Sequence, residues 1–265
     1  SWMGSGQPDF VRHLQILSNG KLRIFPFRPS ELRVHMADYY LSCLGEKRSR
    51  GIFPAVPLRS DAVAWSHQFW RQSGLKEKRV LVLAPGSGAK EKNWPIRFYQ
   101  AVTEWWQRWI GGKVIVVLGP VEEERKEIGN LWSRVLVVRG LELAKVVALL
   151  TRCDCYLGND SGITHLAAAL GVETIAFFGP TDPAQWVPRG KRVTVVTQNV
   201  ECSPCIDSAM KVCPHRKCLT ALSPGGVIGM LKGVLERSPG VGEVSEASLT
   251  RWEAGIRVEV KNGWK

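Results

Sequence analysis

One stretch decides the fold that the sequence predicts, Tyr156-Leu-Gly-Asn-Asp160-Ser-Gly-Ile-Thr-His165-Leu-Ala-Ala-Ala-Leu-Gly171. It indicates the end of a strand, a tight polar turn and a helix. The N–H groups and partial positive charge at a helix N-terminus form an anion site, and Gly162 allows close approach of a ligand. Because Asp160 repels phosphate, we expect it to accept hydrogen bonds from a sugar hydroxyl or from the turn. The pattern indicates a phosphorylated, hydroxyl-rich ligand such as a nucleotide sugar, although an N-cap at Asp160 or Ser161 accounts for the same residues.

The same strand–turn–helix pattern recurs along the chain. Apolar strands are predicted at 80–84, 113–118, 134–138, 155–157, 174–178 and 193–196, with a weaker strand at 256–260. Helices are predicted at about 95–109, 122–132 and 143–151, after Asp160, and at 227–235. This alternation predicts a Rossmann-like, doubly wound parallel α/β sheet with right-handed crossovers. Such sheets bind ligands at the carboxyl ends of their strands, where the polar loops of this chain lie.

The first 75 residues carry weaker signals. They predict an apolar turn at 10–17, a strand at 21–26, helices at about 32–44 and 62–72, and a hinge at 74–78. We therefore expect a partial amino-terminal domain and linker at 1–75, a nucleotide-sugar-binding domain at 76–237, and a polar, Gly-rich carboxyl-terminal tail at 238–265.

Composition narrows the range of partners. The 36 Lys and Arg against 24 Asp and Glu give a formal charge of +12, which favours nucleotides, nucleic acid or an acidic membrane surface. The basic residues are dispersed except at Lys47-Arg-Ser-Arg50, and the absence of a reading motif argues against nucleic acid. Peripheral contact with an acidic membrane stays open. With neither a run of about twenty apolar residues nor a secretory signal, we expect a cytoplasmic location, at most peripheral to the inner membrane.

A Gly-rich loop follows the first predicted strand, Ala84-Pro-Gly-Ser-Gly-Ala-Lys-Glu-Lys-Asn-Trp-Pro95. Its glycines, Gly86 and Gly88, allow close backbone approach, Ser87 offers a hydroxyl, and Lys92 offers an ammonium to a phosphate. The loop matches neither the P-loop nor the dinucleotide fingerprint. A flexible Gly turn is the alternative interpretation.

Two further loops follow later strands. In Gly119-Pro-Val-Glu-Glu-Glu-Arg125, a glutamate such as Glu122 or Glu123 is a candidate contact for ribose hydroxyls, unless these acids only complement a helix dipole. In Phe178-Gly-Pro-Thr-Asp-Pro183, a defined turn presents Thr181 as a candidate phosphate donor.

Taken together, these loops resemble glycosyltransferase family nine, whose best-known members are the ADP-heptose:lipopolysaccharide heptosyltransferases. The resemblance extends over about 79–235 and is carried by Pro-Gly-Ser-Gly…Lys92-Asn-Trp-Pro, Gly-Asn-Asp-Ser-Gly-x-x-His-Leu-Ala-Ala-Ala and Phe-Gly-Pro-Thr-Asp-Pro. It implies a GT-B fold of two Rossmann-like domains around a cleft. It also implies inverting transfer of a heptose or related sugar from an ADP-sugar to a lipopolysaccharide core or another glycan, with no metal or cofactor.

The resemblance also implies residue roles. Lys92 and helix N–H groups would stabilise the departing diphosphate, a glutamate near Glu122 would contact the ribose, and Leu141 would lie near the adenine. The candidate donor-binding residues are Ser87, Gly88, Lys92, Glu122, Glu123, Leu141, Asp160, Ser161, Gly162, His165 and Thr181, and the candidate catalytic residues are Lys92, Asp160 and His165.

The sequence departs from the family at its start. The general base of heptosyltransferases lies early in an amino-terminal domain, which needs roughly 150 residues. We expect this chain to lack the first strands and the base, and nothing supports Asp9 or Asp38 in that role. A non-catalytic or split donor-binding half, or a sugar-nucleotide epimerase of similar architecture, stays open as an alternative.

Seven cysteines divide into two groups. Three of them, Cys43, Cys153 and Cys155, are expected to be buried small residues. The other four form Cys202-x2-Cys205-x7-Cys213-x4-Cys218. For these four, zinc binding, disulfides and reduced thiols all stay open.

Overall fold

A computed structural model describes residues 8–19, 21, 23–29, 34–46, 53–120, 122, 134–205, 207–237 and 257–261. The chain divides into two compact units, one of residues 1–50 with 184–186 and one of residues 51–183 with 187–265. The larger unit contains the sheet and every described candidate site residue. The helix predicted at 122–132, apart from residue 122, and the basic cluster at 47–50 lie outside the described residues. So does the stretch 238–256 of the predicted tail.

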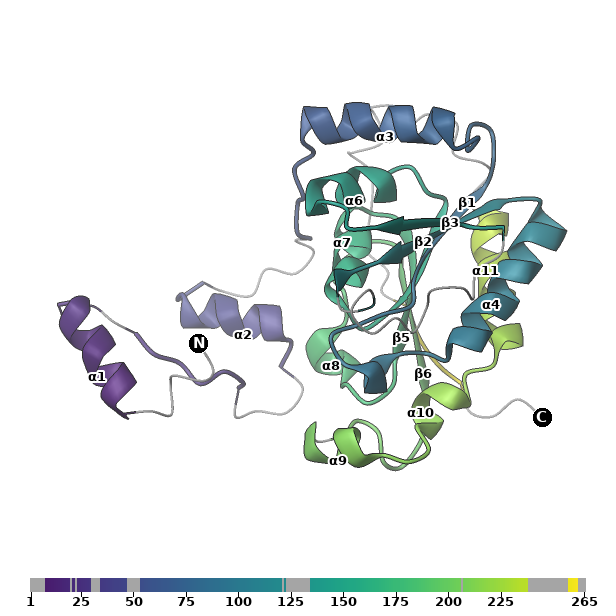
Figure 1. The fold of residues 1–265 in the computed structure, drawn as a ribbon. Helices are drawn as coiled ribbons and strands as arrows, with labels where there is room; N and C mark the ends of the chain where they lie inside the picture. Colours follow the sequence, from purple (N-terminus) through teal and green to yellow (C-terminus); the bar gives the residue numbers. More distant parts are fainter. Residues whose placement is uncertain are drawn as a thin grey trace. The chain divides into compact units, whose positions relative to one another are not determined.

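A parallel sheet with the strand order β3-β2-β1-β4-β5-β6-β7 forms the centre of the larger unit (Figure 1). The strands are β1 (Val80–Ala84), β2 (Lys113–Leu118), β3 (Leu136–Arg139), β4 (Cys155–Asn159), β5 (Glu173–Phe178), β6 (Val193–Gln198) and β7 (Arg257–Lys261). The order reverses between β1 and β4, where doubly wound sheets bind their ligands. Because Ala84 pairs with Gly158, the loops that follow these two strands start side by side. The predicted Rossmann-like parallel sheet is confirmed.

Helices cover both faces of this sheet (Figure 1). On one face, Leu81 and Leu83 of β1 pack with residues of α4 (Ile96–Trp105), α10 (Lys217–Thr220) and α11 (Pro224–Arg237). On the other, Val80 and Val82 pack with α3 (Ser60–Gln72), α6 (Leu143–Leu150) and α7 (Gly162–Ala169). Side chains alternate along a strand, so a strand covered on both faces is apolar throughout.

Shorter elements complete the larger unit. The predicted helix at 95–109 consists of α4 and a following π-helical turn, η2 (Trp106–Ile110), which ends at Gly111 with a left-handed φ of 66°. A 3-10 turn, η1 (Lys90–Lys92), lies in the loop after β1, and α9 (Asp207–Val212) lies in the four-cysteine segment. Among the described residues, no helix is long and apolar enough to cross a membrane.

The smaller unit corrects two predictions. Residues 10–17 belong to a helix, α1 (Pro8–Leu17), because Phe10, Val11, Leu14 and Leu17 recur at helical spacing. The described part of 21–26 contains no strand, since a lone apolar segment ending in proline finds no sheet to pair with. The helix predicted at about 32–44 is present as α2 (Met36–Cys43).

The remaining short helix is α8 (Pro183–Trp186). The larger unit includes α3, which packs against α6 although it precedes the predicted domain boundary at 76. The division into domains stays a prediction.

The buried face of α11 can be tested with Leu231→Ala. Leu231 is 0% exposed, and its truncation leaves a cavity, so we expect the free energy of unfolding to fall by about 2–5 kcal/mol in urea denaturation. The control Leu143→Ala removes a side chain that is 61% exposed, and should change that free energy by less than about 0.5 kcal/mol. Equal losses would contradict this packing.

Candidate functional site

Three candidate residues meet at the reversal of the strand order. Lys92 ends η1 in the loop after β1, Asp160 directly follows β4, and His165 lies in the first turn of α7. Lys92 Nζ donates a hydrogen bond to Asp160 Oδ2 at 2.8 Å. His165 Nε2 lies 4.0 Å from the other carboxylate oxygen, Asp160 Oδ1. The structure thus brings the three predicted catalytic residues together.

Burial strengthens the pair formed by Lys92 and Asp160. The Asp160 side chain is 8% exposed and the Lys92 side chain 26%, so water screens their attraction less than it screens a surface pair. The Lys92 ammonium is a partner of Asp160 that our sequence analysis did not name, and the predicted contact with a sugar hydroxyl stays a prediction. The ammonium carries further N–H donors, so it can contact an anion while it stays paired.

The N-terminus of α7 lies next to this pair. Ser161 is the N-cap residue by its backbone, with φ −153° and ψ 160°, yet its side chain makes no capping hydrogen bond. Its hydroxyl lies 3.2 Å from Thr164 Oγ1 instead. A Cβ at Gly162 would meet no atom within 4 Å, so the backbone there faces open space. The helix end is therefore accessible to an anion that its dipole would stabilise.

Buried hydroxyls hold this turn in place. Tyr156 OH lies 3.0 Å from Thr164 Oγ1, and Thr164 in turn donates a short hydrogen bond to the carbonyl oxygen of Asn159. Burial raises the pKa of Tyr156 well above its ordinary value, while its hydrogen bonds to Thr164 and Ser161 act in the opposite direction. The phenol therefore stays protonated at neutral pH, and the start of α7 stays fixed to β4.

The loop after β1 is internally bonded. Ser87 Oγ lies 2.7 Å from Ala89 O and 2.6 Å from Asn93 Oδ1, and Ser87 is buried. The Ser87 hydroxyl, which we predicted to contact a phosphate, is therefore already hydrogen-bonded within its own loop. A Cβ at Gly88 would meet no atom within 4 Å, so the loop backbone is open to a ligand at that position.

Asn159, the last residue of β4, ties the loop after β1 to the end of β4. Its Oδ1 accepts hydrogen bonds from Trp94 N at 2.8 Å and Tyr99 OH at 3.0 Å, and its Nδ2 donates to Pro85 O at 2.7 Å. Our sequence analysis did not single out Asn159. The available signal was an amide at the end of an otherwise apolar strand, directly before Asp160.

The loops after β2 and β3 contribute two further candidates. Glu122 Oε2 accepts a hydrogen bond from Gly119 N at 2.8 Å, and a Cβ at Gly86 would lie 1.9 Å from Glu122 Oε1. The glutamate therefore lies against the loop after β1. Leu141 follows β3 and is partly buried against the α6 side of the core. Glu123 lies outside the described residues.

Thr181 follows β5 and carries an unusual hydroxyl. Its Oγ1 is buried and has no hydrogen-bond partner in the described part of the chain. A buried hydroxyl without a partner is costly, so this atom is a candidate donor or acceptor for a ligand at the end of β5.

The four-cysteine segment follows β6. Cys202, Cys205, Cys213 and Cys218 are free thiols, and within the described ranges no three Cys, His, Asp or Glu side chains are grouped so that they could hold a metal. Burial, and then the neighbouring Cys205, Cys202 and Cys213, raise the pKa of Cys218 to about 11, so it is a thiol at neutral pH. Of the other three cysteines, Cys153 and Cys155 are buried as predicted, whereas Cys43 is only half-buried because α2 belongs to a small unit with little core.

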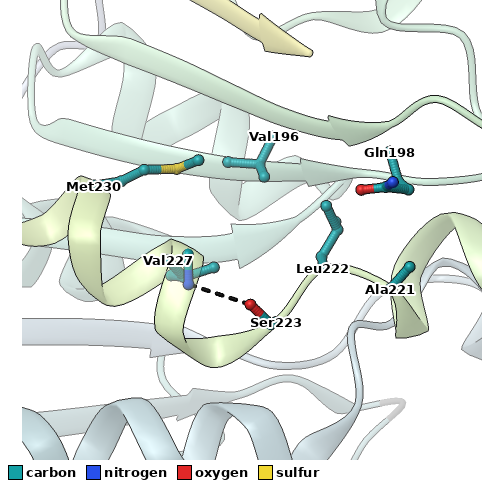
Figure 2. Close-up of a pocket in the computed structure, with 8 residues that line it drawn as sticks. Val196, Gln198, Ala221, Leu222, Ser223, Val227 and Met230 are labelled. Carbon is teal, nitrogen blue, oxygen red and sulfur yellow. Dashed lines mark hydrogen bonds between the residues drawn. The ribbon is translucent and has the colours of Figure 1, made fainter. Parts of the chain in front are cut away.

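A hollow of about 260 Å³, including open solvent, lies between β6 and α11 (Figure 2). Mostly apolar side chains line it, namely Val196, Gln198, Ala221, Leu222, Ser223, Val227 and Met230, as Figure 2 shows. None of the candidate site residues lines this hollow.

The pair of Lys92 and Asp160 can be tested through stability. Lys92→Met keeps an apolar stem but leaves a carboxylate that is 8% exposed without its ammonium, so we expect the free energy of unfolding to fall by about 1–3 kcal/mol. The matched control, Lys76→Met, breaks a surface pair at 3.6 Å and should cost less than about 0.5 kcal/mol. Adding Asp160→Asn to Lys92→Met should recover part of the loss; a fully additive cycle would argue against the pairing.

Comparisons with known proteins agree with this geometry. The sequence model of glycosyltransferase family 9 (heptosyltransferase) matches residues 50–214. Lipooligosaccharide heptosyltransferase 2 of Campylobacter jejuni is 28% identical over 173 residues, which cover 61% of this chain and 52% of that protein. The chain thus spans about half the length of this curated relative.

Two solved structures share the fold. A glycosyl transferase family 9 protein from Veillonella parvula has a TM-score of 0.65 and 24% identity, covering 80% of this chain and 63% of that one. The E. coli ADP-heptose lipopolysaccharide heptosyltransferase II has a TM-score of 0.61 and 18% identity, covering 77% and 62%. These neighbours confirm the predicted GT-B-like α/β fold class. The loops quoted above lie within the matched region, and the chain belongs to glycosyltransferase family 9, the heptosyltransferase family.

Proposed function

We propose that the larger unit binds an ADP-heptose-like sugar nucleotide and that the protein transfers the sugar, with inversion, to a lipopolysaccharide core or another glycan. One observation carries the proposal. At the reversal of the strand order, the Lys92 ammonium and the N-terminus of α7 converge on Asp160, with Lys92 Nζ at 2.8 Å from Asp160 Oδ2. Positive groups gathered in this way suit the diphosphate of a sugar nucleotide, which supports the proposal.

Electrostatics explains how these groups would act on the reaction. When the glycosidic bond of the donor breaks, the departing diphosphate gains negative charge. Positive groups that are already in place stabilise that charge more than they stabilise the intact donor, which lowers the barrier. Lys92 and the N–H groups of Ser161 and Gly162 are proposed in this role. His165, 4.0 Å from Asp160, would contact the diphosphate or the sugar from the first turn of α7.

The other candidates would hold the rest of the donor. Glu122 would accept hydrogen bonds from ribose hydroxyls, because it lies beside Gly86 of the loop that carries Lys92. Leu141 would lie against the adenine, since it follows β3, the strand next to β2 in the sheet. The unpartnered hydroxyl of Thr181 would bond a phosphate oxygen or a sugar hydroxyl.

Donor binding can be measured by isothermal titration of the full chain with ADP and with ADP-heptose. We expect saturable binding, weakened about tenfold or more by Lys92→Ala and by Asp160→Ala, because one change removes the cation and the other its support. As a control, Lys76→Ala removes an exposed lysine that is paired with Glu77, and it should leave the affinity unchanged. A wild-type chain that binds neither ligand would refute the proposal.

Transfer requires its own assay. With ADP-heptose and a lipopolysaccharide core acceptor, a competent chain should release ADP only when the acceptor is present, and the product should carry the inverted linkage. Binding without acceptor-dependent release would assign the chain to donor binding alone. Isomerised sugar nucleotide in the absence of acceptor would identify an epimerase instead.

A further inference from the structure

Asn159 occupies a position that the proposed donor site depends on. It is 0% exposed at the end of β4. Its amide contacts both ends of the loop that carries Lys92, with Pro85 O 2.7 Å away at the start of the loop and Trp94 N 2.8 Å away at its end. A third bond, from Tyr99 OH at 3.0 Å, reaches the first turns of α4.

The partners leave one orientation for this amide. Trp94 N can only donate and Pro85 O can only accept, so the oxygen must face the former and the nitrogen the latter. Burial raises the pKa of Tyr99 well above its ordinary value, which keeps its hydroxyl available as a donor. A side chain with one acceptor and one donor at this position is therefore needed. A carboxylate could not donate to Pro85 O, and an apolar side chain would leave several buried groups unpaired.

The far end of the loop is anchored a second time through Trp94. Its ring stacks on Phe177 of β5 with ring centroids 4.3 Å apart, and its Nε1 donates to Leu222 O at 2.9 Å. Lys92 lies two residues before this anchor, and its own N–H donates to Ala89 O at 3.0 Å. Both ends of a short loop are thus fixed to the sheet, and the Lys92 side chain reaches Asp160 from a fixed backbone.

We infer that Asn159 is a positioning residue, which holds the loop 85–94 against the end of β4 and so sets the Lys92 ammonium beside the N-terminus of α7. This role rests on the proposed donor binding. In this role Asn159 does not touch the donor, and it acts only through Lys92. A loop released from Asn159 would let the ammonium leave the place where the diphosphate needs it, and small displacements of such groups are costly.

A double-mutant cycle on donor affinity tests this role. Asn159→Asp keeps the shape of the side chain but loses the donor to Pro85 O. We expect it to weaken ADP-heptose binding about tenfold at pH 8, and to weaken it less than about twofold when Lys92 is already alanine, because coupled residues are not additive. Lowering the pH should reduce the difference in ADP-heptose affinity between Asn159→Asp and the wild type, because a protonated carboxyl can again donate a hydrogen bond to Pro85 O.

Two further variants separate positioning from stability. Tyr99→Phe removes only the hydroxyl that bonds Asn159 Oδ1, and should weaken binding about twofold to fivefold, again only while Lys92 is present. Leu231→Ala destabilises the core between the sheet and α11 but removes none of the hydrogen bonds of Asn159. It should therefore leave the affinity unchanged at temperatures where the protein stays folded.

The outcomes are distinct. If the wild type binds and the effects of Asn159→Asp or Tyr99→Phe are the same with and without Lys92, the positioning role is wrong and the proposed donor site stands. The role is also wrong if Leu231→Ala weakens binding as much as Asn159→Asp does. If the wild type binds neither ADP nor ADP-heptose, the proposed function fails and the positioning role fails with it.

Discussion

Burial of both faces of the parallel sheet is the constraint on which the rest of the structure depends. Each central strand must be apolar on both sides, as β1 and β4 are, because helices cover both faces. Polar side chains are thereby displaced to the ends of the strands. Since all the paired strands run in parallel, these ends lie along one edge of the sheet, and the reversal between β1 and β4 places two of them side by side.

The polar groups at that edge must form hydrogen bonds or ion pairs with one another even when no ligand is bound. Asn159 and Asp160 are both nearly inaccessible to water, and buried polar groups are costly unless they are bonded. The loop after β1 meets this need: its backbone bonds the amide of Asn159, and its lysine bonds the carboxylate of Asp160. The same contacts that stabilise the fold therefore also order a cation beside a helix N-terminus.

This arrangement suits the sugar-nucleotide binding that we propose. A diphosphate leaving group needs positive charge that does not have to reorganise during the reaction. Here the cation is held by a carboxylate that is itself fixed to the sheet, since Asp160 N donates to Phe177 O at 3.1 Å. Four of the loops at this edge, after β1, β2, β4 and β5, each carry at least one of the candidate site residues.

The sequence by itself determined the strands, the parallel sheet and the family, because apolar runs that end in Gly, Asp or Ser turns are local signals. It also singled out Lys92, Asp160 and His165 as candidates, and the structure brings these three side chains together. It was wrong about 10–17, where the helical spacing of the apolar residues was overlooked, and about 21–26, where a short apolar segment has no strand to pair with. It also passed over Asn159. Lys92 and Asp160 are 68 residues apart in the chain. Only the tertiary structure decided that they pair, that the Ser87 hydroxyl bonds within its own loop, and that Asn159 holds the loop after β1 to the end of β4. Such contacts depend on which strands become neighbours.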